Sequence, residues 1–205
     1  MFNPCRFFLF VVYMATEAIS LGWNCESAGK GVQLGIRKTK ANGYQTCPFD
    51  ECITNYDGIV LCLKEDFKHF CDIAYLQIIP AAFSTGGIVK NEPLLYNTRY
   101  NFIFNHESPE HANLYLSQSW SGGKNHYVDN NFALFIERYN RRIESFRTYL
   151  DNNKITFVIG KNDDNISELS ETIKEKYPKL NYDIMCYRPN DTITVVEEHH
   201  ILMKR

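Results

Sequence analysis

The sequence predicts an α/β protein of three layers, with a largely parallel sheet between flanking helices, as in Rossmann-like folds. Three observations support this class. A short apolar strand at 18–21 ends at Gly22 and leads into a helix over about 26–34. Residues 154–187 give a strand, a helix and a strand with short links, which is the βαβ pattern of parallel sheets. The segment 132–150 is the clearest helix, with one apolar stripe that can cover a sheet.

The stretch between the first helix and residue 131 gives weaker signals. Pro48 marks a Cys-Pro-Phe-Asp turn, because proline holds the residue before it in an extended conformation. Residues 56–71 form a predicted helix, with apolar side chains at helical spacing: Ile59, Leu63, Phe67 and Phe70. Tyr96 and the segment 100–104 suggest strands, and the Ser-Gly-Gly sequence at 121–123 marks a loop.

The elements after residue 131 follow from clearer patterns. The apolar stripe of the helix at 132–150 consists of Phe132, Phe135, Ile136, Tyr139, Ile143, Phe146 and Leu150. Four basic side chains lie largely off this stripe: Arg138, Arg141, Arg142 and Arg147. A strand at 154–159 then stops at Gly160, and a helix follows at 167–177, with Ser167 or alternatively Ser170 as its N-cap. Strands are predicted at 182–187 and 192–196.

Composition and charge exclude several classes of protein. The 22 basic residues against 24 acidic ones give a net charge of -2, so no basic face for nucleic acid is expected. The seven cysteines are odd in number and lie in apolar runs. This indicates reduced thiols in a cytoplasmic protein rather than a disulfide framework. Cys47 and Cys52 are poorly spaced for zinc, and we expect neither a metal nor a cofactor.

The first 15 residues form a separate segment, and residues 16–205 are expected to be a single α/β domain. Arg6 precedes an apolar run at 7–15 that resembles the core of a signal peptide. This run is shorter than the roughly 20 apolar residues that a membrane span requires, so no integral membrane span is expected. Three interpretations stay open: an extension upstream of a start at Met14, a signal for the secretory route, or an added strand.

The segment from Ser20 to Cys25 is the best candidate for an active centre. Ligands of open α/β sheets bind beyond the carboxyl ends of the strands, and this segment leaves such an end. Gly22 permits a sharp turn, and Cys25 would stand at the start of the next helix. The unpaired amides and the dipole there stabilise an anion, which lowers the pKa of a thiol. The alternative is a buried core cysteine, because free cysteine is among the most buried residue types.

A thiol nucleophile also needs a base, and six histidines compete for that role. His106 follows the apolar run at 100–104, in a second loop at a strand end, where functional groups tend to lie. His126, with Asp129 three residues later, is the runner-up in a glycine-bearing loop. Others are expected to be packed or solvated: His69, His199 and His200.

Several motifs occur in a characteristic order. They are Ser-Leu-Gly-x-Asn-Cys at 20–25, Pro-Phe-Asp at 48–50, His-Glu at 106–107, Arg-Tyr-Asn-Arg-Arg-Ile at 138–143, and the strand at 155–159. This order resembles a family described as papain-like cysteine peptidases, found in bacterial surface-polysaccharide gene neighbourhoods and in some large DNA viruses. The resemblance covers most of the chain, from Ile19 to about Tyr187.

The resemblance implies a catalytic centre of cysteine, histidine and acid. Cys25 would be the nucleophile, His106 the base, and Asp50 or Glu107 the acid that orients the base. Asn24 or backbone amides near Cys25 would stabilise an oxyanion. The resemblance also implies a papain-like α+β fold as the alternative to the Rossmann-like one, because papain-type enzymes pair a helix-borne cysteine with a histidine on an antiparallel sheet.

Two departures from the usual family motifs, together with three arginines, leave other functions open. This chain has His-Glu where the family usually has His-Asp, and Glu51 follows Pro-Phe-Asp where an aromatic residue is commoner. The basic residues Arg138, Arg141 and Arg142 form either a solvated helix face or an anion clamp, because guanidinium groups bind phosphate or carboxylate bidentately.

The sequence thus gives three hypotheses. The first is a thiol-dependent hydrolase or transferase acting on a peptide or isopeptide. The second is a Rossmann-like glycosyl- or phosphoryl-transfer enzyme, with a glycan among its substrates, in which Cys25 is structural. The third is a non-catalytic module, for instance a viral protein that binds a host protein in the host cytoplasm.

Overall fold

A computed structural model describes residues 17–85, 88–109, 123–151, 154–161, 165–189 and 194–196. The predicted N-terminal segment 1–15 lies outside these residues, as do His199 and His200. The first strand, β1 (Glu17–Gly22), leads directly into α1 (Cys25–Gln33), as the sequence predicts. Five short 3-10 helices also occur among the described residues: η1 (Lys40–Asn42), η2 (Pro48–Asp50), η3 (Ile73–Tyr75), η4 (Asn105–Glu107) and η5 (Gly123–Asn125).

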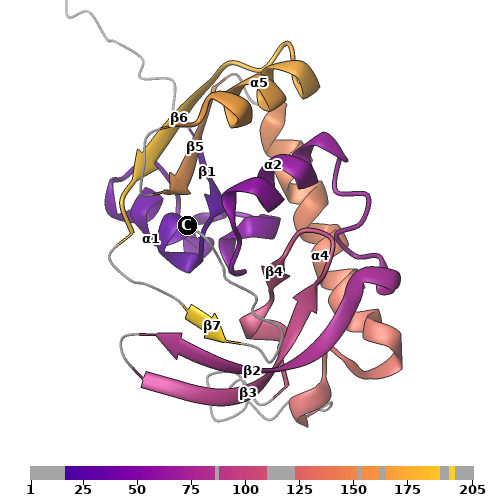
Figure 1. The fold of residues 1–205 in the computed structure, drawn as a ribbon. Coiled ribbons are helices and arrows are strands. Elements are labelled where there is room, and N and C mark those ends of the chain that lie inside the picture. Colours follow the sequence, from indigo (N-terminus) through magenta and orange to yellow (C-terminus); the bar gives the residue numbers. More distant parts are fainter. Residues whose placement is uncertain are drawn as a thin grey trace, which may run out of the picture.

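The predicted parallel sheet is present and has three described strands. Its order is β1-β5-β6, with β5 at Ile155–Gly160 and β6 at Tyr182–Tyr187. Both pairs are parallel, and α5 (Ser167–Lys176) connects β5 to β6 (Figure 1). The βαβ unit is therefore confirmed, but the N-cap of α5 is Ile166, and Asn165 Oδ1 accepts the Ser167 N–H at 3.3 Å.

A second sheet is antiparallel. The sequence suggests strands at three of its positions, namely Tyr96, 100–104 and 192–196, but only the papain-like alternative includes an antiparallel sheet. Its order is β4-β3-β2-β7, with β2 at Leu76–Thr85, β3 at Ile88–Asn97, β4 at Phe102–Ile103 and β7 at Thr194–Val196. Pro80 pairs with Pro93 across β2 and β3, and proline within a run argues against a strand, which obscures this hairpin. The expectation of a parallel sheet with helices is therefore confirmed only for β1-β5-β6, and the antiparallel sheet fits the papain-like alternative. Over the residues that the structure describes, the protein has a mixed α/β architecture with two sheets (Figure 1).

Two helices differ from their predicted form. The helix predicted at 56–71 is α2 (Tyr56–Lys64), because Asp66 and Phe67 adopt positive φ of 49° and 60° and end it. The long helix is α4 (Asp129–Leu150), whose first turn is irregular. Its predicted apolar stripe is confirmed by the burial of Phe135, Tyr139, Ile143 and Phe146.

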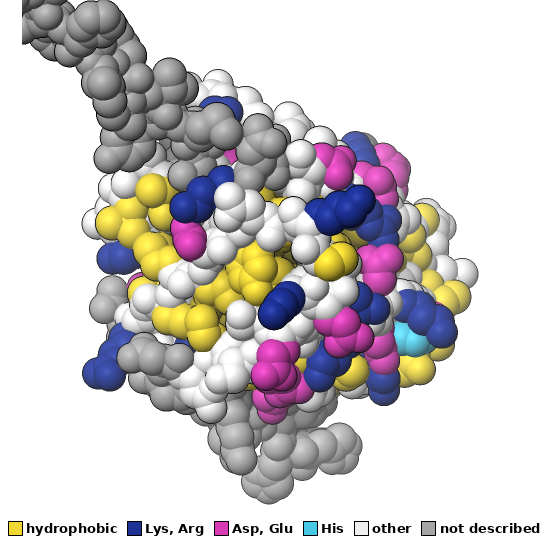
Figure 2. All heavy atoms as spheres, turned by 90° about the horizontal axis from the view of Figure 1, so that it is seen from above, with side chains coloured by type: hydrophobic (Ala, Val, Ile, Leu, Met, Phe, Trp, Pro, Cys, Tyr) yellow, Lys and Arg dark blue, Asp and Glu magenta, His cyan; other side chains and the backbone are white. Residues whose placement is uncertain are grey.

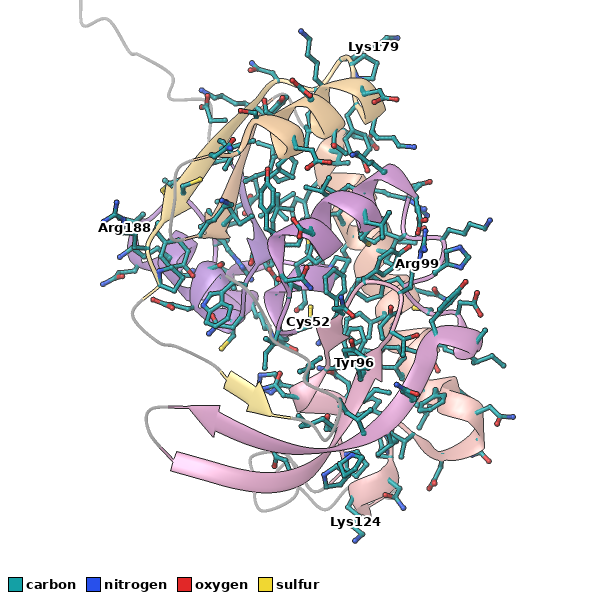
Figure 3. All side chains as sticks on the ribbon, viewed as in Figure 1. Cys52, Tyr96, Arg99, Lys124, Lys179 and Arg188 are labelled. Carbon is teal, nitrogen blue, oxygen red and sulfur yellow. The ribbon has the colours of Figure 1, made fainter. Side chains whose placement is uncertain are left out.

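The core is rich in aromatic side chains and has two parts. In the larger part, the fully buried Phe49 ring contacts four other phenylalanine rings: Phe67, Phe70, Phe102 and Phe146. The Cys-Pro-Phe-Asp turn is thus fixed in the centre of the molecule. A smaller cluster lies between the turn after β1 and the antiparallel sheet: Trp23, Ile53, Ile79, Leu94, Tyr96 and Ile103. Figure 3 labels one residue of each part, Cys52 in the larger part and Tyr96 in the smaller cluster.

The surface carries charges of both signs. Figure 2 shows basic and acidic side chains interspersed over the visible face. Among the described residues, no helix is both long and apolar enough to cross a bilayer.

Candidate active site

Cys25 occupies the position that its sequence context predicts. Gly22 ends β1 with φ of +99°, and Asn24 Oδ1 accepts the Glu26 N–H at 2.8 Å, which caps α1. Cys25 is the first residue of α1 and is exposed. The other described cysteines are buried or half-buried: Cys47, Cys52, Cys62, Cys71 and Cys186. The alternative of a buried core cysteine is therefore wrong.

The pKa of the Cys25 thiol is raised, whereas its place at a helix start predicts that it is lowered. Partial burial of the sulfur raises this pKa most, and the carboxylates of Glu51 and Glu26 raise it further. The backbone N–H of Cys25 lowers it, but not enough to compensate. The thiol therefore keeps its proton near neutral pH, and chemistry at this sulfur needs a base.

His106 lies at the end of the antiparallel sheet's edge strand. It follows β4, within η4, and is half-buried. Ile53 and Ile103 exchange two backbone hydrogen bonds of 2.8 and 2.9 Å, and the Thr54 N–H donates to the Trp23 carbonyl at 2.8 Å. The segment Ile53–Thr54 therefore joins the turn that precedes Cys25 to the strand that precedes His106.

Two other histidines have local partners. His69 Nδ1 lies 3.0 Å from Asp72 Oδ2, and its ring packs against Tyr75, in agreement with a packing role. His126 follows η5 and packs edge-on against Tyr127, with ring centroids 4.8 Å apart. Within the described part of the chain, no group of three or more histidine, cysteine, aspartate or glutamate residues could hold a metal ion.

Asp50 is almost fully buried and holds the Cys-Pro-Phe-Asp turn. Its Oδ1 is 2.9 Å from Arg37 Nη1, and its Oδ2 accepts the Cys47 N–H at 2.7 Å. The Arg37 guanidinium also stacks 3.8 Å above the Tyr44 ring. Burial raises the pKa of Asp50, and Arg37 and the Cys47 N–H oppose that rise. These contacts give Asp50 a clear structural role.

Glu107 is completely buried and faces α4. Arg138 Nε and Arg142 Nη1 lie 2.9 and 3.4 Å from its Oε1, and the Tyr139 hydroxyl donates to its Oε2 at 3.1 Å. Glu51 binds the same two arginines and also Lys40. We call the set Glu51, Glu107, Arg138 and Arg142 the acid–arginine network. Within it, the guanidinium groups are held by carboxylates of the chain itself.

The three arginines considered as an anion clamp do not share one environment. Arg142 is 5% exposed and lies among the apolar side chains of α4, so the expectation that it lies off the buried stripe is wrong. Arg141 is exposed and forms an ion pair of 3.5 Å with Glu137 on the same helix. It borders an open cavity of about 460 Å³ between α4 and Gln45. Arg141 is therefore separate from the acid–arginine network.

Glu51 should make the folded protein sensitive to acid. Burial raises its pKa, but Arg142, Lys40 and Arg138 lower it to about 2 from an ordinary 4.5. The stability this provides is fully present above pH 4.5 and is lost as the pH falls from 4.5 toward 2. By linkage, Glu51→Gln should reduce the pH 6 to pH 2 difference in unfolding free energy by about 2 to 3 kcal/mol. Urea titrations at several pH values measure this, and an equal pH dependence in both proteins would contradict it.

The sequence interpretation missed a group at the carboxyl edge of the parallel sheet. Ser27 Oγ donates to the Gly22 carbonyl and lies 2.9 Å from the Tyr187 hydroxyl at the end of β6. Gly160 ends β5 beside them, where a Cβ would come within 3.0 Å of the Tyr187 hydroxyl. A signal was present, because the ends of neighbouring parallel strands share one edge. The predicted active centre takes in the end of β1 alone.

The chain matches one family model over most of its length. The family described as "Putative papain-like cysteine peptidase (DUF1796)" matches residues 16–187, which include Cys25, Asp50 and His106. A search of the curated proteins found no match, and a search of the solved structures found none either.

Proposed function

Because the chain belongs to the family described as "Putative papain-like cysteine peptidase (DUF1796)", we propose that it is a thiol-dependent hydrolase of peptide or isopeptide bonds. Cys25 is the nucleophile and His106 is the base. The alternative transferase would use the arginines as an anion clamp. The partners of Arg138 and Arg142 favour the thiol site instead, because both guanidinium groups already bind Glu51 and Glu107.

One observation carries the proposal. Cys25 is an exposed thiol at the first position of α1, and its turn is hydrogen-bonded through Ile53–Thr54 to the strand that precedes His106. Papain-type enzymes pair a helix-borne cysteine with a histidine on an antiparallel sheet. Here the cysteine begins a helix and the histidine follows β4 of the antiparallel sheet, which supports the papain-like alternative over the Rossmann-like one.

The chemistry follows from the raised pKa of the Cys25 thiol. His106 removes the thiol proton, and the sulfur attacks the carbonyl carbon of the scissile bond. The oxyanion that forms takes hydrogen bonds from backbone amides near Cys25 and from the Asn24 side-chain amide, whose oxygen caps α1. His106 then gives its proton to the leaving amine and activates the water that hydrolyses the thioester.

The orienting acid is Glu107 or Asp50. Glu107 follows His106 directly and is held by Arg138, Arg142 and Tyr139. Asp50 is held by Arg37 and the Cys47 N–H. Glu107→Gln and Asp50→Asn separate the two, because only loss of the orienting acid should lower the rate in protein that remains folded at the assay temperature.

Selective labelling of Cys25 tests the proposal. The native protein is treated with iodoacetamide, and each thiol is followed by mass spectrometry. We expect Cys25 to react faster than the half-buried Cys71 and Cys186. Hydrolysis of a peptide library should fall by about 10³-fold or more in Cys25→Ala, as for other nucleophile deletions, and remain in Cys71→Ala.

Two outcomes would overturn the proposal. If Cys25 is labelled no faster than the half-buried thiols, it is not an activated nucleophile. Full activity in Cys25→Ser makes this residue structural, as the transferase hypothesis requires.

A further inference from the structure

Three strands of the parallel sheet end around the first turn of α1. Gly22 ends β1, Gly160 ends β5 and Tyr187 ends β6. A Cβ on Gly160 would come within 2.9 Å of Trp23 Cδ1 and 3.0 Å of the Tyr187 hydroxyl. The absence of a side chain at Gly160 therefore lets the phenol and the indole approach each other beside α1.

The hydroxyls of Tyr187 and Ser27 form a directed chain. A serine hydroxyl carries one proton, and Ser27 Oγ donates it to the Gly22 carbonyl. At 2.9 Å, the hydrogen bond between the two hydroxyls must then be donated by Tyr187. We call this chain, from Tyr187 through Ser27 to the Gly22 carbonyl, the hydroxyl relay.

The surroundings of Tyr187 keep its proton in place. Burial raises the pKa of the phenol most, and the charges of Glu26 and Cys25 raise it further. Ser27 lowers it only by donating to the phenolate, and the Gly22 carbonyl competes for that proton. Because its pKa is raised above the ordinary value, the phenol is a neutral hydrogen-bond donor at neutral pH. Its hydrogen-bond partner Ser27 lies two residues after Cys25 in α1, which places the phenol beside the turn that carries the candidate nucleophile.

We propose that Tyr187, acting through Ser27, positions the turn that carries Cys25 and so sets the reactivity of its thiol. The inference rests on the proposed function, in which Cys25 is the nucleophile. Ser27 belongs to the first turn of α1 and Gly22 ends the strand before it, so the relay connects the two sides of the turn. Because the relay reaches Cys25 only through this turn, Tyr187 is a positioning residue.

A matched control exists on the same strand. Tyr182 begins β6, and its hydroxyl lies 3.2 Å from Ser170 Oγ on α5 and 3.0 Å from the Ser170 carbonyl. Tyr182→Phe and Tyr187→Phe thus each remove a phenol hydrogen bond to a serine on a helix. Only Tyr187→Phe removes it beside Cys25.

The test follows alkylation of Cys25 by iodoacetamide in the full chain between pH 6 and pH 10. In Tyr187→Phe we expect Cys25 alkylation at pH 7.5 to slow by about 3- to 10-fold, the equivalent of one net hydrogen bond. The apparent pKa of Cys25 should rise, because its backbone N–H would no longer be held toward the thiolate. Ser27→Ala should slow Cys25 alkylation to the same extent. The double variant of Tyr187→Phe and Ser27→Ala should be no slower than either single variant. Ser27→Thr keeps the hydroxyl and should react at the native rate.

The result that overturns the relay is a pH profile of Cys25 in Tyr187→Phe that matches those of the native protein and Tyr182→Phe. Additive effects of Tyr187→Phe and Ser27→Ala would overturn it as well. The relay test compares the alkylation rate of Cys25 between variants, and this rate can be measured even if Cys25 reacts no faster than the other thiols. Failure of the relay is therefore distinct from failure of the proposed function. Thermal melts show that each variant is folded where it is assayed.

Discussion

Replacing Arg142 with methionine is expected to lower the free energy of unfolding by about 3 to 5 kcal/mol, the usual result of removing one partner from a buried ion pair. Arg142 is 5% exposed and binds the carboxylates of Glu51 and Glu107. Methionine fills a similar volume but leaves Glu107, which is completely buried, with Arg138 as its remaining cation. Urea denaturation at pH 7 measures the loss.

The loss in Arg142→Met should depend on pH in a defined direction. Burial raises the pKa of Glu107, and Arg142 is the strongest of the groups that lower it. Without Arg142 this pKa rises further, so the penalty is smallest below the ordinary value of 4.5 and grows as the pH rises through the folded value. The deficit at pH 4 should therefore be smaller than the deficit at pH 7.

Arg141→Met is the matched control. Arg141 is the neighbouring residue on α4, but its side chain is 72% exposed and pairs with the exposed Glu137. Removing an exposed pair costs about 0 to 1 kcal/mol. Equal losses in the Arg141 and Arg142 variants would contradict the structural role of the acid–arginine network.

Sequence reasoning placed the elements whose signals are local. Gly22 at a strand end and Asn24 before a helix are local signals, and they located β1, α1 and Cys25. The strand, helix and strand of β5, α5 and β6 were located for the same reason. The end of α2 was missed because Phe67 and Phe70 keep the helical spacing beyond Lys64, and turns after the helix still direct both rings into the core.

The features that the sequence did not predict depend on contacts between residues far apart in the chain. Arg142 is 91 residues from Glu51, and Ser27 is 160 residues from Tyr187. No periodicity reports such pairs, so the burial of Arg142 could not be predicted. The phenol beside α1 is indicated only indirectly, because the ends of neighbouring parallel strands share one edge. The direction of the Cys25 pKa was wrong for the same reason. The helix start is a local feature, whereas burial of the thiol, which raises this pKa most, and the Glu51 carboxylate depend on distant parts of the chain.

Replacing Gly22 with alanine should be the most damaging single change in the turn before Cys25. Gly22 has φ of +99°, and an added Cβ would lie 1.9 Å from Thr54 Oγ1. The left-handed backbone costs about 1 to 2 kcal/mol for a residue with a Cβ, and overpacking a filled core costs about 1 to 3 kcal/mol more. We therefore expect a loss of about 2 to 5 kcal/mol in unfolding free energy, measured by urea denaturation.

Gly43→Ala separates the two causes. Gly43 has φ of +92° but no atom within 4 Å of an added Cβ, so its variant should lose the backbone part alone. In the Gly22→Ala background, Thr54→Ala should recover stability because it removes the hydroxyl that an alanine Cβ meets, whereas Thr54→Val should not. Equal losses at Gly22 and Gly43 would show that Thr54 does not confine the turn. A larger loss at Gly22, with slower alkylation of Cys25, would show that contact with Thr54 holds the turn before Cys25 in place.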